Sequence, residues 1–558
     1  MVPSAIVGLV EFPRTRVGKV DRSALPICDF RAAAYTATDL SALLPVECQL
    51  IQAVADCLRL DPSTIRLDAT FYQIGGNSLT AIQLASRCQN LKLNLTVADF
   101  DRQSTIRQLA HRATRATEVL APSISSAAAG EGPGSLTPAQ LQLFECELIN
   151  PQLVAIPVIF KIRRPYPLDK WLAAVNQIVQ RHSMLRARFS RDPSTDIVSY
   201  SIGSTAAEHY RLEYHQVATM EDMNVVLIES FQRLDFWDGH LSEFQVFDLN
   251  GTQYFFHCTH HLSNDYLASA IISEEVEYLL LDRPLPPVTT PFQVWAAHLY
   301  RLAQQIDPRS ISLPTGIPLL TTSLPTDVTP DSQLNHGHVL QLTLSGQETR
   351  RLLFDVCERL QASQLELILA SVLETYVSVF RLGVLGLDFF THGRQSLGPD
   401  LIDVTRTVGH FAHNFPLSIT APPELNMSTA LRAVKQQLPD MLREGPKRAL
   451  VKYLHNFQDP DLREKFKIQP QIAFSYLARL TAAGDNNEGS LFIEKPNLIE
   501  SLRSLHRINE QPYALSITAQ HAGDFLHLDI RHRYNQLPRY VAKKFLTKWR
   551  DTLLGYLQ

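Results

Sequence analysis

The chain has 558 residues, of which 45% are hydrophobic and 19% charged, and its net charge is −4. That length predicts three or four domains, and the weak negative charge argues against a nucleic-acid partner. The seven cysteines are scattered without a CxxC pair, which favours reduced thiols. The first residues lack the pattern of a secretion signal, and no apolar run is long enough for a membrane span. We therefore expect a cytoplasmic protein.

Residues 1–26 have a short strand-like run and then a turn that places Lys19 at a loop tip. A solvated lysine is the default interpretation. The stretch resembles the last segment of an adenylation domain, in which a Gly-Lys lysine contacts the carboxylate that is activated. The nucleotide-binding core of such a domain does not precede Lys19. We therefore expect 1–26 to be an adenylation-domain remnant that cannot activate a substrate, and 27–42 to be a linker.

Residues 43–116 have the pattern of a small helical domain. Apolar residues at helical spacing predict helices over 49–60, 78–88 and 105–116. A proline-containing turn at 61–63 ends the first of them. A domain of about 75 residues has only a thin core, and this size suits a mobile shuttle better than a catalyst.

Two glycines, Gly75 and Gly76, permit a sharp turn, after which Ser78 begins a helix. From these residues alone, Ser78 is an ordinary N-cap serine. The run from Asp68 to Leu79, DATFYQIGGNSL, resembles the attachment signature of carrier domains in nonribosomal peptide synthetases. The resemblance implies a four-helix peptidyl carrier bundle with 4'-phosphopantetheine held covalently on Ser78.

Residues 117–134 are rich in small residues, proline and glycine, a composition typical of a flexible linker. Beyond them, strand-like and helical runs alternate, which indicates a two-lobed α/β protein. A proline- and threonine-rich crossover begins at Ile306, so we divide this region into lobes at 135–305 and 306–558. The expected strands include 154–163 and 253–261, and the expected helices 168–182, 269–282, 345–360 and 363–380.

Three histidines and a cysteine lie at the end of an aromatic strand, in the run HCTHHLSND from His257 to Asp265. Satisfied imidazoles are one interpretation. A metal site is a second, but neighbouring strand residues point to opposite faces, so His260 and His261 cannot easily share an ion. Acid–base chemistry is a third, because a histidine near neutral pKa can accept a proton from an attacking amine or hydroxyl.

The run from His260 to Asp265 also resembles the HHxxxD motif of the condensation-domain superfamily. The resemblance implies a catalytic site formed by His260, His261 and Asp265, without a metal. Its second histidine, His261, is the catalytic one, and Asp265 is mainly structural and forms a salt bridge. We expect Arg186 or Arg394 to be the partner of Asp265.

Four further runs resemble motifs of the same family, so the resemblance covers essentially the entire chain. It implies two chloramphenicol-acetyltransferase-like lobes with a tunnel entered from both sides. The predicted fold class is therefore multidomain, a small four-helix carrier bundle followed by an α/β two-lobed condensation domain. The four runs are LTPAQ at 136–140, RHSMLRARF at 181–189, FQVW at 292–295 and VGHFAHNFPL at 408–417.

The runs THGRQ at 391–395, RTVG at 406–409 and FSYL at 474–477 most resemble the epimerization branch. That branch needs a second acid–base group, a glutamate two residues before the HGR histidine. The residue here is Phe390, which cannot exchange a proton. A non-catalytic recruitment module is another alternative, but such relatives typically have a degraded HHxxxD motif. Tyr266 stands where relatives have glycine, and we expect it to narrow the acceptor side.

These observations predict a nonribosomal peptide synthetase carrier–condensation didomain of the fungal freestanding or terminal type. It transfers an acyl or aminoacyl group from phosphopantetheine on Ser78 to an amine or a hydroxyl, so that an amide or ester is formed and released. The expected partners are a phosphopantetheinyl transferase, a separate loading ligase or adenylation enzyme acting in trans, and a small-molecule or carrier-bound acceptor. The sequence does not identify the acyl group or the acceptor.

Overall fold

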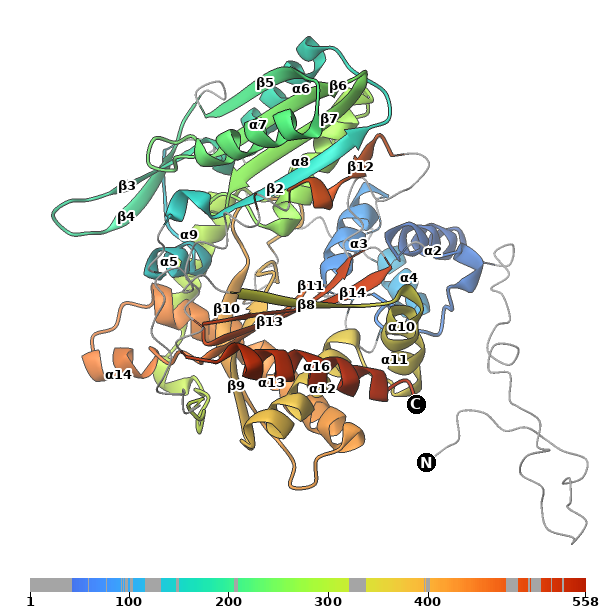
Figure 1. Ribbon diagram of the computed structural model, residues 1–558, viewed down its shortest axis with the longest axis vertical. Helices are drawn as coiled ribbons and strands as arrows, with labels where there is room; N and C mark the ends of the chain where they lie inside the picture. Colours follow the sequence, from blue (N-terminus) through green and yellow to red (C-terminus); the bar gives the residue numbers. More distant parts are fainter. Residues whose placement is uncertain are drawn as a thin grey trace, which may run out of the picture.

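The computed structural model places a small helical domain beside two larger lobes (Figure 1). The predicted adenylation remnant (1–26), the linker 27–42 and most of the linker 117–134 lie outside the described residues. The structure describes residues 43–58, 60–76, 78–91, 93, 95, 99–100, 104–115, 132–146, 150–204, 209–320, 338–395, 397, 402–477, 490–499, 502, 513–522, 524–533 and 536–558.

The helical domain contains α2 (Pro45–Leu58), the 3₁₀ turn η3 (Pro62–Thr64), α3 (Ser78–Asn90) and α4 (Ile106–Arg115). Helix α2 begins four residues earlier than predicted, because a proline is favourable in the first turn of a helix. Helix α3 begins at Ser78, as predicted. The inward faces of the helices bury a small core that includes Leu50, Val54, Phe71, Leu84 and Leu109.

The first lobe is built on a five-stranded sheet with the order β12-β2-β7-β6-β5. Helices α6 (Leu168–Arg181) and α8 (Tyr266–Leu280) pack on one face, and α7 (Met220–Gln232) packs on the other. Because both faces are covered, the inner strands are buried along most of their length, and their buried positions include polar residues such as Glu243, Gln245 and His257. The strands are β2 (Ala155–Ile162), β5 (Tyr210–Val217), β6 (Ser242–Leu249), β7 (Thr252–His260) and β12 (Phe492–Glu494).

A three-stranded sheet, β1-β4-β3, extends from this lobe. Its first strand, β1 (Gly132–Gly134), contains the last three residues of the predicted linker, which therefore ends before 132. The other strands are β3 (Ala187–Arg191) and β4 (Val198–Ile202). Two helices, α5 (Pro138–Glu145) and α9 (Phe292–Gln305), contribute to the core below it. Short 3₁₀ turns are η7 (Pro151–Leu153), η8 (Ser183–Arg186), η10 (Pro308–Ser310) and η12 (Pro496–Ile499).

The second lobe is built on a six-stranded sheet with the order β10-β9-β11-β13-β14-β8. Helices α12 (Gln364–Phe380), α13 (Met427–Leu454) and α16 (Arg539–Gly555) cover one face and bury the largest core. Helix α14 (Pro460–Lys465) is peripheral. The strands are β8 (His338–Leu344), β9 (Val384–Thr391), β10 (His413–Thr420), β11 (Ile472–Leu477), β13 (Leu515–Ala522) and β14 (Phe525–His532).

The helix predicted over 345–360 is present over Gly346–Arg359, but it is not α-helical along its whole length. It consists of α10 (Gly346–Arg350), a π-helical segment (Arg351–Val356) and α11 (Cys357–Arg359). In the described part of the chain, no single helix meets the length and hydropathy expected of a membrane span. Within the same described residues, this segment and α12 meet them together as a pair, and the pair is bent by 100°.

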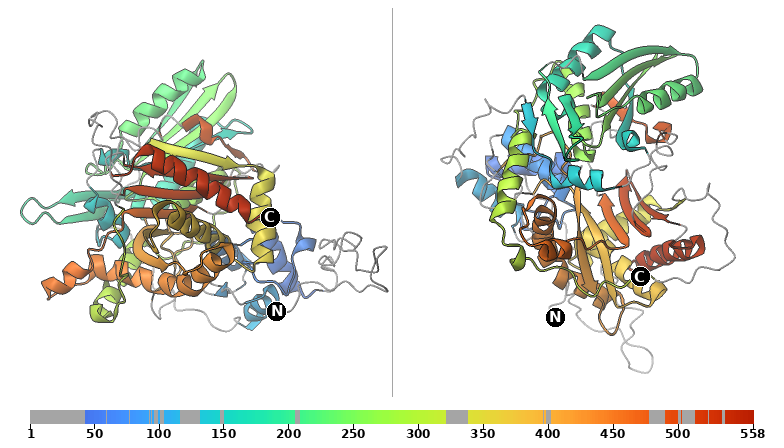
Figure 2. Two further views of the ribbon diagram at one scale, coloured as in Figure 1. Left: turned by 60° about the horizontal axis from the view of Figure 1, so that its bottom comes forward. Right: turned by 90° about the vertical axis from the view of Figure 1, so that its left-hand side faces the viewer.

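One strand crosses between the lobes. Strand β12, which lies in the sequence range predicted for the second lobe, pairs antiparallel with β2 in the sheet of the first. Phe492 of β12 stacks on Phe160 with ring centroids 5.0 Å apart, so the crossing strand also contributes to the first core. The views in Figure 2 show the lobes packed edge to edge, with the helical domain against them.

Candidate active site

The paired histidines lie where β7 ends. This strand is buried along most of its length, between helices on both faces of the sheet. His260 is its last residue, and both of its ring nitrogens are engaged: Nε2 lies 2.9 Å from the Pro151 carbonyl, and Nδ1 accepts from the Leu262 amide at 3.1 Å. His260 is therefore held in the fold rather than presented to a ligand.

His261 is half-buried, and its backbone amide donates to the Val154 carbonyl at 2.8 Å. Its ring lies against the ring of His410, with centroids 4.4 Å apart. Its Nδ1 is buried and has no partner among the described residues, so the accessible part of the ring is away from Nδ1. Burial lowers the pKa of His261, and Asp265 opposes that shift only in part. The imidazole is therefore neutral near pH 7 and can accept a proton.

Asp265 joins the two lobes. It caps α8 by accepting from the Ala268 amide at 2.8 Å. Its carboxylate also lies 3.0 Å from Nη2 of Arg394 and accepts from the Phe411 amide at 3.2 Å. Of the two arginines predicted as partners, Arg394 makes the ion pair, whereas Arg186 donates to backbone carbonyls of its own lobe.

Arg394 follows β9, so this charge comes from the second lobe. Its guanidinium is fully buried, donates to the Val404 and Thr407 carbonyls, and lies 4.0 Å above the ring of Phe411. A buried cation with this many partners fixes the loop that carries it. The loop after β9 is thereby held against the turn that carries His261.

A second ionic network crosses the lobes beside the first. Glu275 of α8 is buried and pairs with Arg406 at 3.0 Å, Arg181 at 2.9 Å and His182 at 2.9 Å. Burial by itself raises the pKa of Glu275, but His182 and the two arginines lower it to about 2. The runs singled out in the sequence contain the two arginines and His182. Glu275 was not predicted, because the sequence offers no signal for it.

The predicted attachment serine, Ser78, is the first residue of α3, and its side chain lies outside the described part of the structure. Gly75 before it has φ +99, a conformation that favours glycine, and a Cβ on Gly76 would lie 2.4 Å from the Phe71 ring. The two glycines are therefore required for the turn. A helix N-terminus suits a phosphate group, so the described residues fit the phosphopantetheine group.

The carrier contacts both lobes. Ile82, one helical turn beyond Ser78, is buried in the same core cluster as Leu267 and Ile271 of α8. On the other side, the Phe354 ring of the π-helical segment lies 2.6 Å from the Cβ position of Gly75. A cavity of about 400 Å³ lies between α2, α3 and α8 at this contact. The helix after Asp265 is thus also the helix on which the carrier rests.

The position that decides between branches is Phe390 on β9. Its side chain is 39% exposed and makes an edge contact with the Tyr513 ring at 6.3 Å. It shares a sheet face with Asp388, two residues earlier.

No cluster of three potential metal ligands with suitable geometry occurs among the described residues.

Comparison with protein families identifies two regions. Residues 131–558 match the Condensation domain model, and residues 48–113 match the model of the Phosphopantetheine attachment site. The chain belongs to the condensation-domain family. It carries a phosphopantetheine carrier domain before the condensation domain, an architecture of nonribosomal peptide synthetases, and its chemistry is acyl transfer. The predicted carrier, cofactor and family are confirmed.

Curated relatives are long synthetases. The chain is 28% identical over 85% of its length to nonribosomal peptide synthetase ungA of Aspergillus violaceofuscus, of which it covers 5%. Against nonribosomal peptide synthetase anaPS of Neosartorya fischeri, the identity is 26% over 91% of the chain and 22% of the relative. It is 26% identical over 87% of its length to chondramide synthase cmdD of Chondromyces crocatus, of which it covers 12%. The chain thus spans a small part of these relatives.

Solved structures confirm the two-lobed fold. The epimerization domain from the third module of tyrocidine synthetase B superposes with a TM-score of 0.62 at 19% identity, over 76% of this chain and 96% of that one. The condensation domain of Monacolin K polyketide synthase MokA gives 0.60 at 14% identity, over 76% and 97%. A condensation domain that mediates chain release from the enacyloxin polyketide synthase gives 0.54 at 17% identity, over 87% and 98%.

Proposed function

We propose that the chain transfers an acyl or aminoacyl group from its own carrier to an amine or hydroxyl acceptor, with His261 as general base. The observation that supports the proposal is that a single helix, α8, lies next to both the histidine turn and the carrier. Helix α8 begins beside the turn that holds His261, and its first two turns pack against the carrier helix that starts at Ser78. A tethered carrier raises the effective concentration of its cargo at that site.

In this proposal His261 takes the proton of the attacking nucleophile, because its ring is neutral near pH 7 and partly accessible. His260 and Asp265 are positioning residues. His260 ties the end of β7 to the Pro151 carbonyl, and Asp265 ties the turn to Arg394 of the second lobe. A base held within a rigid turn needs little reorganisation during the reaction.

The phosphopantetheine group on Ser78, when bound, supplies the thiol that holds the acyl group as a thioester. A phosphopantetheinyl transferase installs it, and a separate ligase or adenylation enzyme loads it in trans. The acceptor is a small molecule or a second carrier-bound group, and the new bond is an amide or an ester. This chemistry is that of a cytoplasmic pathway with access to coenzyme A.

Epimerization is not favoured, because it removes a proton from one side of a carbon and returns it from the other. That requires two acid–base groups. The position of the second one is occupied by Phe390, a partly exposed phenylalanine without a titratable group. Transfer to a nucleophile needs only one base, and His261 supplies it.

The test separates loading from transfer. The full chain is incubated with coenzyme A and a broad-specificity phosphopantetheinyl transferase, and its intact mass is measured. The mass gain is expected in the wild type and in Ser63→Ala, a half-buried serine of the carrier whose hydroxyl donates to Asp61, and is expected to disappear in Ser78→Ala. His261→Ala is expected to load normally and to lose transfer. A His261→Ala variant that transfers at the wild-type rate contradicts the assignment of the base.

A further inference from the structure

The ring that packs against His261 belongs to the other lobe. His410 lies shortly before β10, in the second lobe, and its side chain is buried. The centroid of its ring lies 4.4 Å from that of His261, and the two ring planes are inclined by 45°. Rings this close are in direct contact, so no other side chain separates them. The proposed base is thus supported by a second imidazole.

Each of these two rings has a buried nitrogen without a partner. Nδ1 of His261 and Nδ1 of His410 are buried and form no hydrogen bond with any described residue. The neighbouring imidazoles are engaged, since both ring nitrogens of His260 have partners and Nδ1 of His413 lies 3.1 Å from the Phe411 carbonyl. Buried polar atoms in proteins are almost always hydrogen-bonded. Two unpartnered nitrogens on touching rings therefore require an explanation.

The work of a general base fixes where the proton of His261 must be. A neutral imidazole carries a proton on one nitrogen and a lone pair on the other. The lone pair must be on the accessible side of the ring, at Nε2, so the proton must be on the buried Nδ1. That N–H needs an acceptor. Asp265 is committed to other donors, because it accepts from Ala268, Arg394 and Phe411.

The ring of His410 is suited to be that acceptor. Burial lowers the pKa of His410 well below its ordinary value, and the neighbouring rings of His261, His260 and His413 lower it further, against a small opposing contribution from the Ala412 backbone. His410 is therefore neutral near pH 7. With its proton on Nε2, its buried Nδ1 offers a lone pair. A neutral ring also does not repel the charge that His261 gains as a base.

We propose that His410 is a positioning residue for the proposed base: its Nδ1 accepts a hydrogen bond from Nδ1–H of His261. This bond keeps the lone pair at Nε2 of His261 directed toward the nucleophile, and the inference rests on the proposed function. The two rings are in contact without a formed bond in this structure. Catalytic hydrogen bonds are often long in the free enzyme and tighten when the substrate is bound.

The hydrogen bond strengthens during the reaction. The nucleophile forms a bond to the acyl carbon, and its proton passes to Nε2 of His261, which makes this ring an imidazolium. The bond from Nδ1–H to His410 then becomes charge-assisted and roughly twice as strong. When the carbon–sulfur bond breaks, the proton passes from Nε2 to the departing sulfur. Nδ1 of His261 keeps its proton throughout, and His410 gains none.

The segment that carries His410 is fixed to the first lobe directly after this residue. The amide of Phe411 donates to Asp265 at 3.2 Å. The ring of Phe411 makes an edge contact with Phe292 of α9, with centroids 5.1 Å apart. The backbone beside His410 is therefore held against the turn that carries His261.

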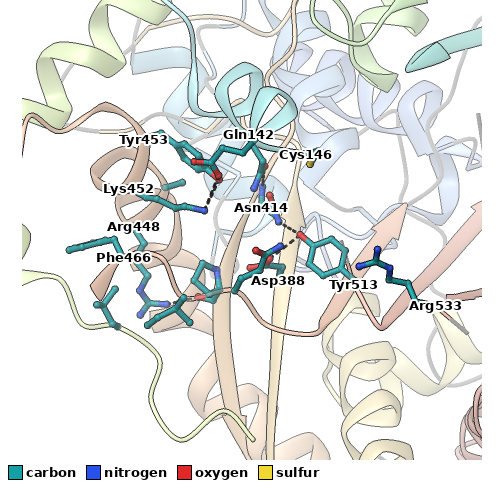
Figure 3. A pocket seen from close by; sticks show the side chains of 16 residues that line it. Gln142, Cys146, Asp388, Asn414, Arg448, Lys452, Tyr453, Phe466, Tyr513 and Arg533 are labelled. Carbon is teal, nitrogen blue, oxygen red and sulfur yellow. Dashed lines mark hydrogen bonds and ion pairs between the residues drawn. The ribbon is translucent and has the colours of Figure 1, made fainter. Parts of the chain in front are cut away.

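The other end of the segment is fixed within the second lobe. The Asn414 side-chain amide donates to the Tyr513 hydroxyl at 2.6 Å, and that hydroxyl donates to Asp388 at 2.9 Å. Figure 3 shows this chain of bonds beside a cavity of about 300 Å³, which no residue of the HHxxxD turn lines. His410 lies close to both anchors, so its ring cannot leave His261 without breaking one of them.

The first test locates the proton and does not depend on transfer. The full chain is prepared in deuterated form with isotope-labelled histidine ring nitrogens. A long-range proton–nitrogen correlation spectrum distinguishes protonation at Nδ1 from protonation at Nε2. The signals of His261 are those that disappear in His261→Gln. We expect His261 to carry its proton on Nδ1 near neutral pH, and a proton on Nε2 overturns the inference.

Two variants of His410 separate hydrogen bonding from packing. His410→Phe keeps a ring and removes the acceptor, so we expect His261 to lose its preference for protonation at Nδ1. His410→Asn keeps an acceptor at the position of Nδ1 and is expected to preserve that preference. An unchanged preference in His410→Phe overturns the inference. Circular dichroism checks the fold, and His410→Gln, whose oxygen lies at the position of Nε2, replaces His410→Phe if that variant unfolds.

The matched control is another stacked histidine. His215 lies against the ring of Phe247, with centroids 5.4 Å apart, on the outermost strand β5 of the first lobe. His215→Phe exchanges the same two side chains away from the histidine turn. It is expected to leave the signals of His261 and the rate of transfer unchanged.

Transfer from a loaded carrier ranks the same variants. Loss of a hydrogen bond to a charged group is expected to slow transfer about 10- to 100-fold in His410→Phe, and by less than about threefold in His410→Asn. Carrier loading is expected to be normal in both. A packing role gives the opposite order, because phenylalanine fills the space of the imidazole better than asparagine. Transfer by His410→Phe at or above the rate of His410→Asn therefore overturns the inference.

Failure of the inference and failure of the proposed function are distinguishable. If the wild type transfers and His261→Ala does not, but His410→Phe leaves the proton of His261 in place, the positioning role is contradicted and the proposed function stands. If no acyl group is transferred by the wild type, but the proton on Nδ1 of His261 depends on His410, the hydrogen bond stands and the proposed function is contradicted.

Discussion

In each lobe, one strand of the sheet is followed by a polar loop at the seam, the interface between the two lobes. The two loops differ in length and in the functional residues that they contain. After β7 the chain turns within a few residues into α8, and the turn carries His261 and Asp265. After β9 it runs through a long loop to β10, and that loop carries Arg394. The short turn holds an imidazole rigidly, and the long loop supplies the charge that compensates its carboxylate.

The difference teaches that neither lobe contains a complete site. Asp265 without Arg394 would be a buried carboxylate with no ion pair, and Arg394 without Asp265 would be a buried cation. Removing one partner of a buried pair costs more than the pair contributes. The pair therefore makes the geometry of the histidine turn depend on how the lobes are docked.

The largest expected effect is on the short turn itself. His261→Ala removes the proposed base and is expected to slow transfer by about 10²- to 10⁴-fold, while carrier loading remains normal. The measurement is product formation from a loaded carrier by mass spectrometry. His527→Ala, a histidine on β14 of the other sheet, is the control. Equal rates in the two variants would remove His261 from the reaction.

The next prediction concerns a variant that breaks the ion pair between Asp265 and Arg394 at the interface between the lobes. Arg394→Met leaves Asp265 buried and unpaired, and we expect it to lower the free energy of unfolding by about 3–5 kcal/mol. Urea denaturation followed by tryptophan fluorescence measures the loss. Arg66→Met is the matched control, since its ion pairs with Asp68 at 3.1 Å and with Glu358 at 3.9 Å are exposed and each worth at most about 1 kcal/mol. Similar losses in both variants would show that the seam does not depend on the buried pair.

The next prediction concerns Asp388 of the second lobe, whose titration makes the stability of the protein depend on pH. Burial raises its pKa from 3.8 to about 7, against opposing contributions from Tyr513, Lys452 and Asn414. Because the folded state holds the proton more tightly, its contribution to stability is fully present below pH 3.8 and is lost as the pH rises through 7. Asp388→Asn removes this dependence.

We therefore expect the stability of Asp388→Asn relative to the wild type to increase by about 3 kcal/mol between pH 5 and pH 8. Unfolding in urea at both pH values measures it. Asp440→Asn, an exposed carboxylate on α13, is the control and should show no such trend. A constant difference between Asp388→Asn and the wild type across this range would mean that Asp388 is ionised throughout.

The smallest expected effect is at the carrier contact. Phe354→Ala removes the ring that faces Gly75, and we expect transfer to slow by about two- to fivefold with loading unchanged, because one apolar contact contributes about 1 kcal/mol. Tyr540→Ala, an exposed ring on the first turn of α16, is the control. A Phe354→Ala variant indistinguishable from it would place the productive carrier position elsewhere.

Local signals in the sequence predicted the local parts of this structure. The start of α3 at Ser78 followed from two glycines, and the end of β7 at the histidines followed from an aromatic strand. Both depend on a few consecutive residues, whose conformational preferences act without the rest of the chain.

The parts that could not be predicted are pairings between distant residues. Nothing in the sequence distinguishes Arg394 from Arg186 as the partner of Asp265, because the choice is made by the docking of two lobes. The contact of Glu275 with Arg406 and the chain from Asn414 to Asp388 are of the same kind. Periodicity reports which face of an element is buried and not what that face meets.

Strand β12 has a consequence for how the protein is synthesised. Phe492 pairs with Ile162, so more than 300 residues separate the two sides of that edge. At the usual speed of translation, β2 waits roughly 15 to 65 s for its neighbour to leave the ribosome. During that interval an apolar strand edge is unprotected. Most of the first lobe is therefore synthesised early, but its sheet is completed only when β12 has left the ribosome. The yield of folded protein in a cell should depend on chaperones that cover β2 during that interval.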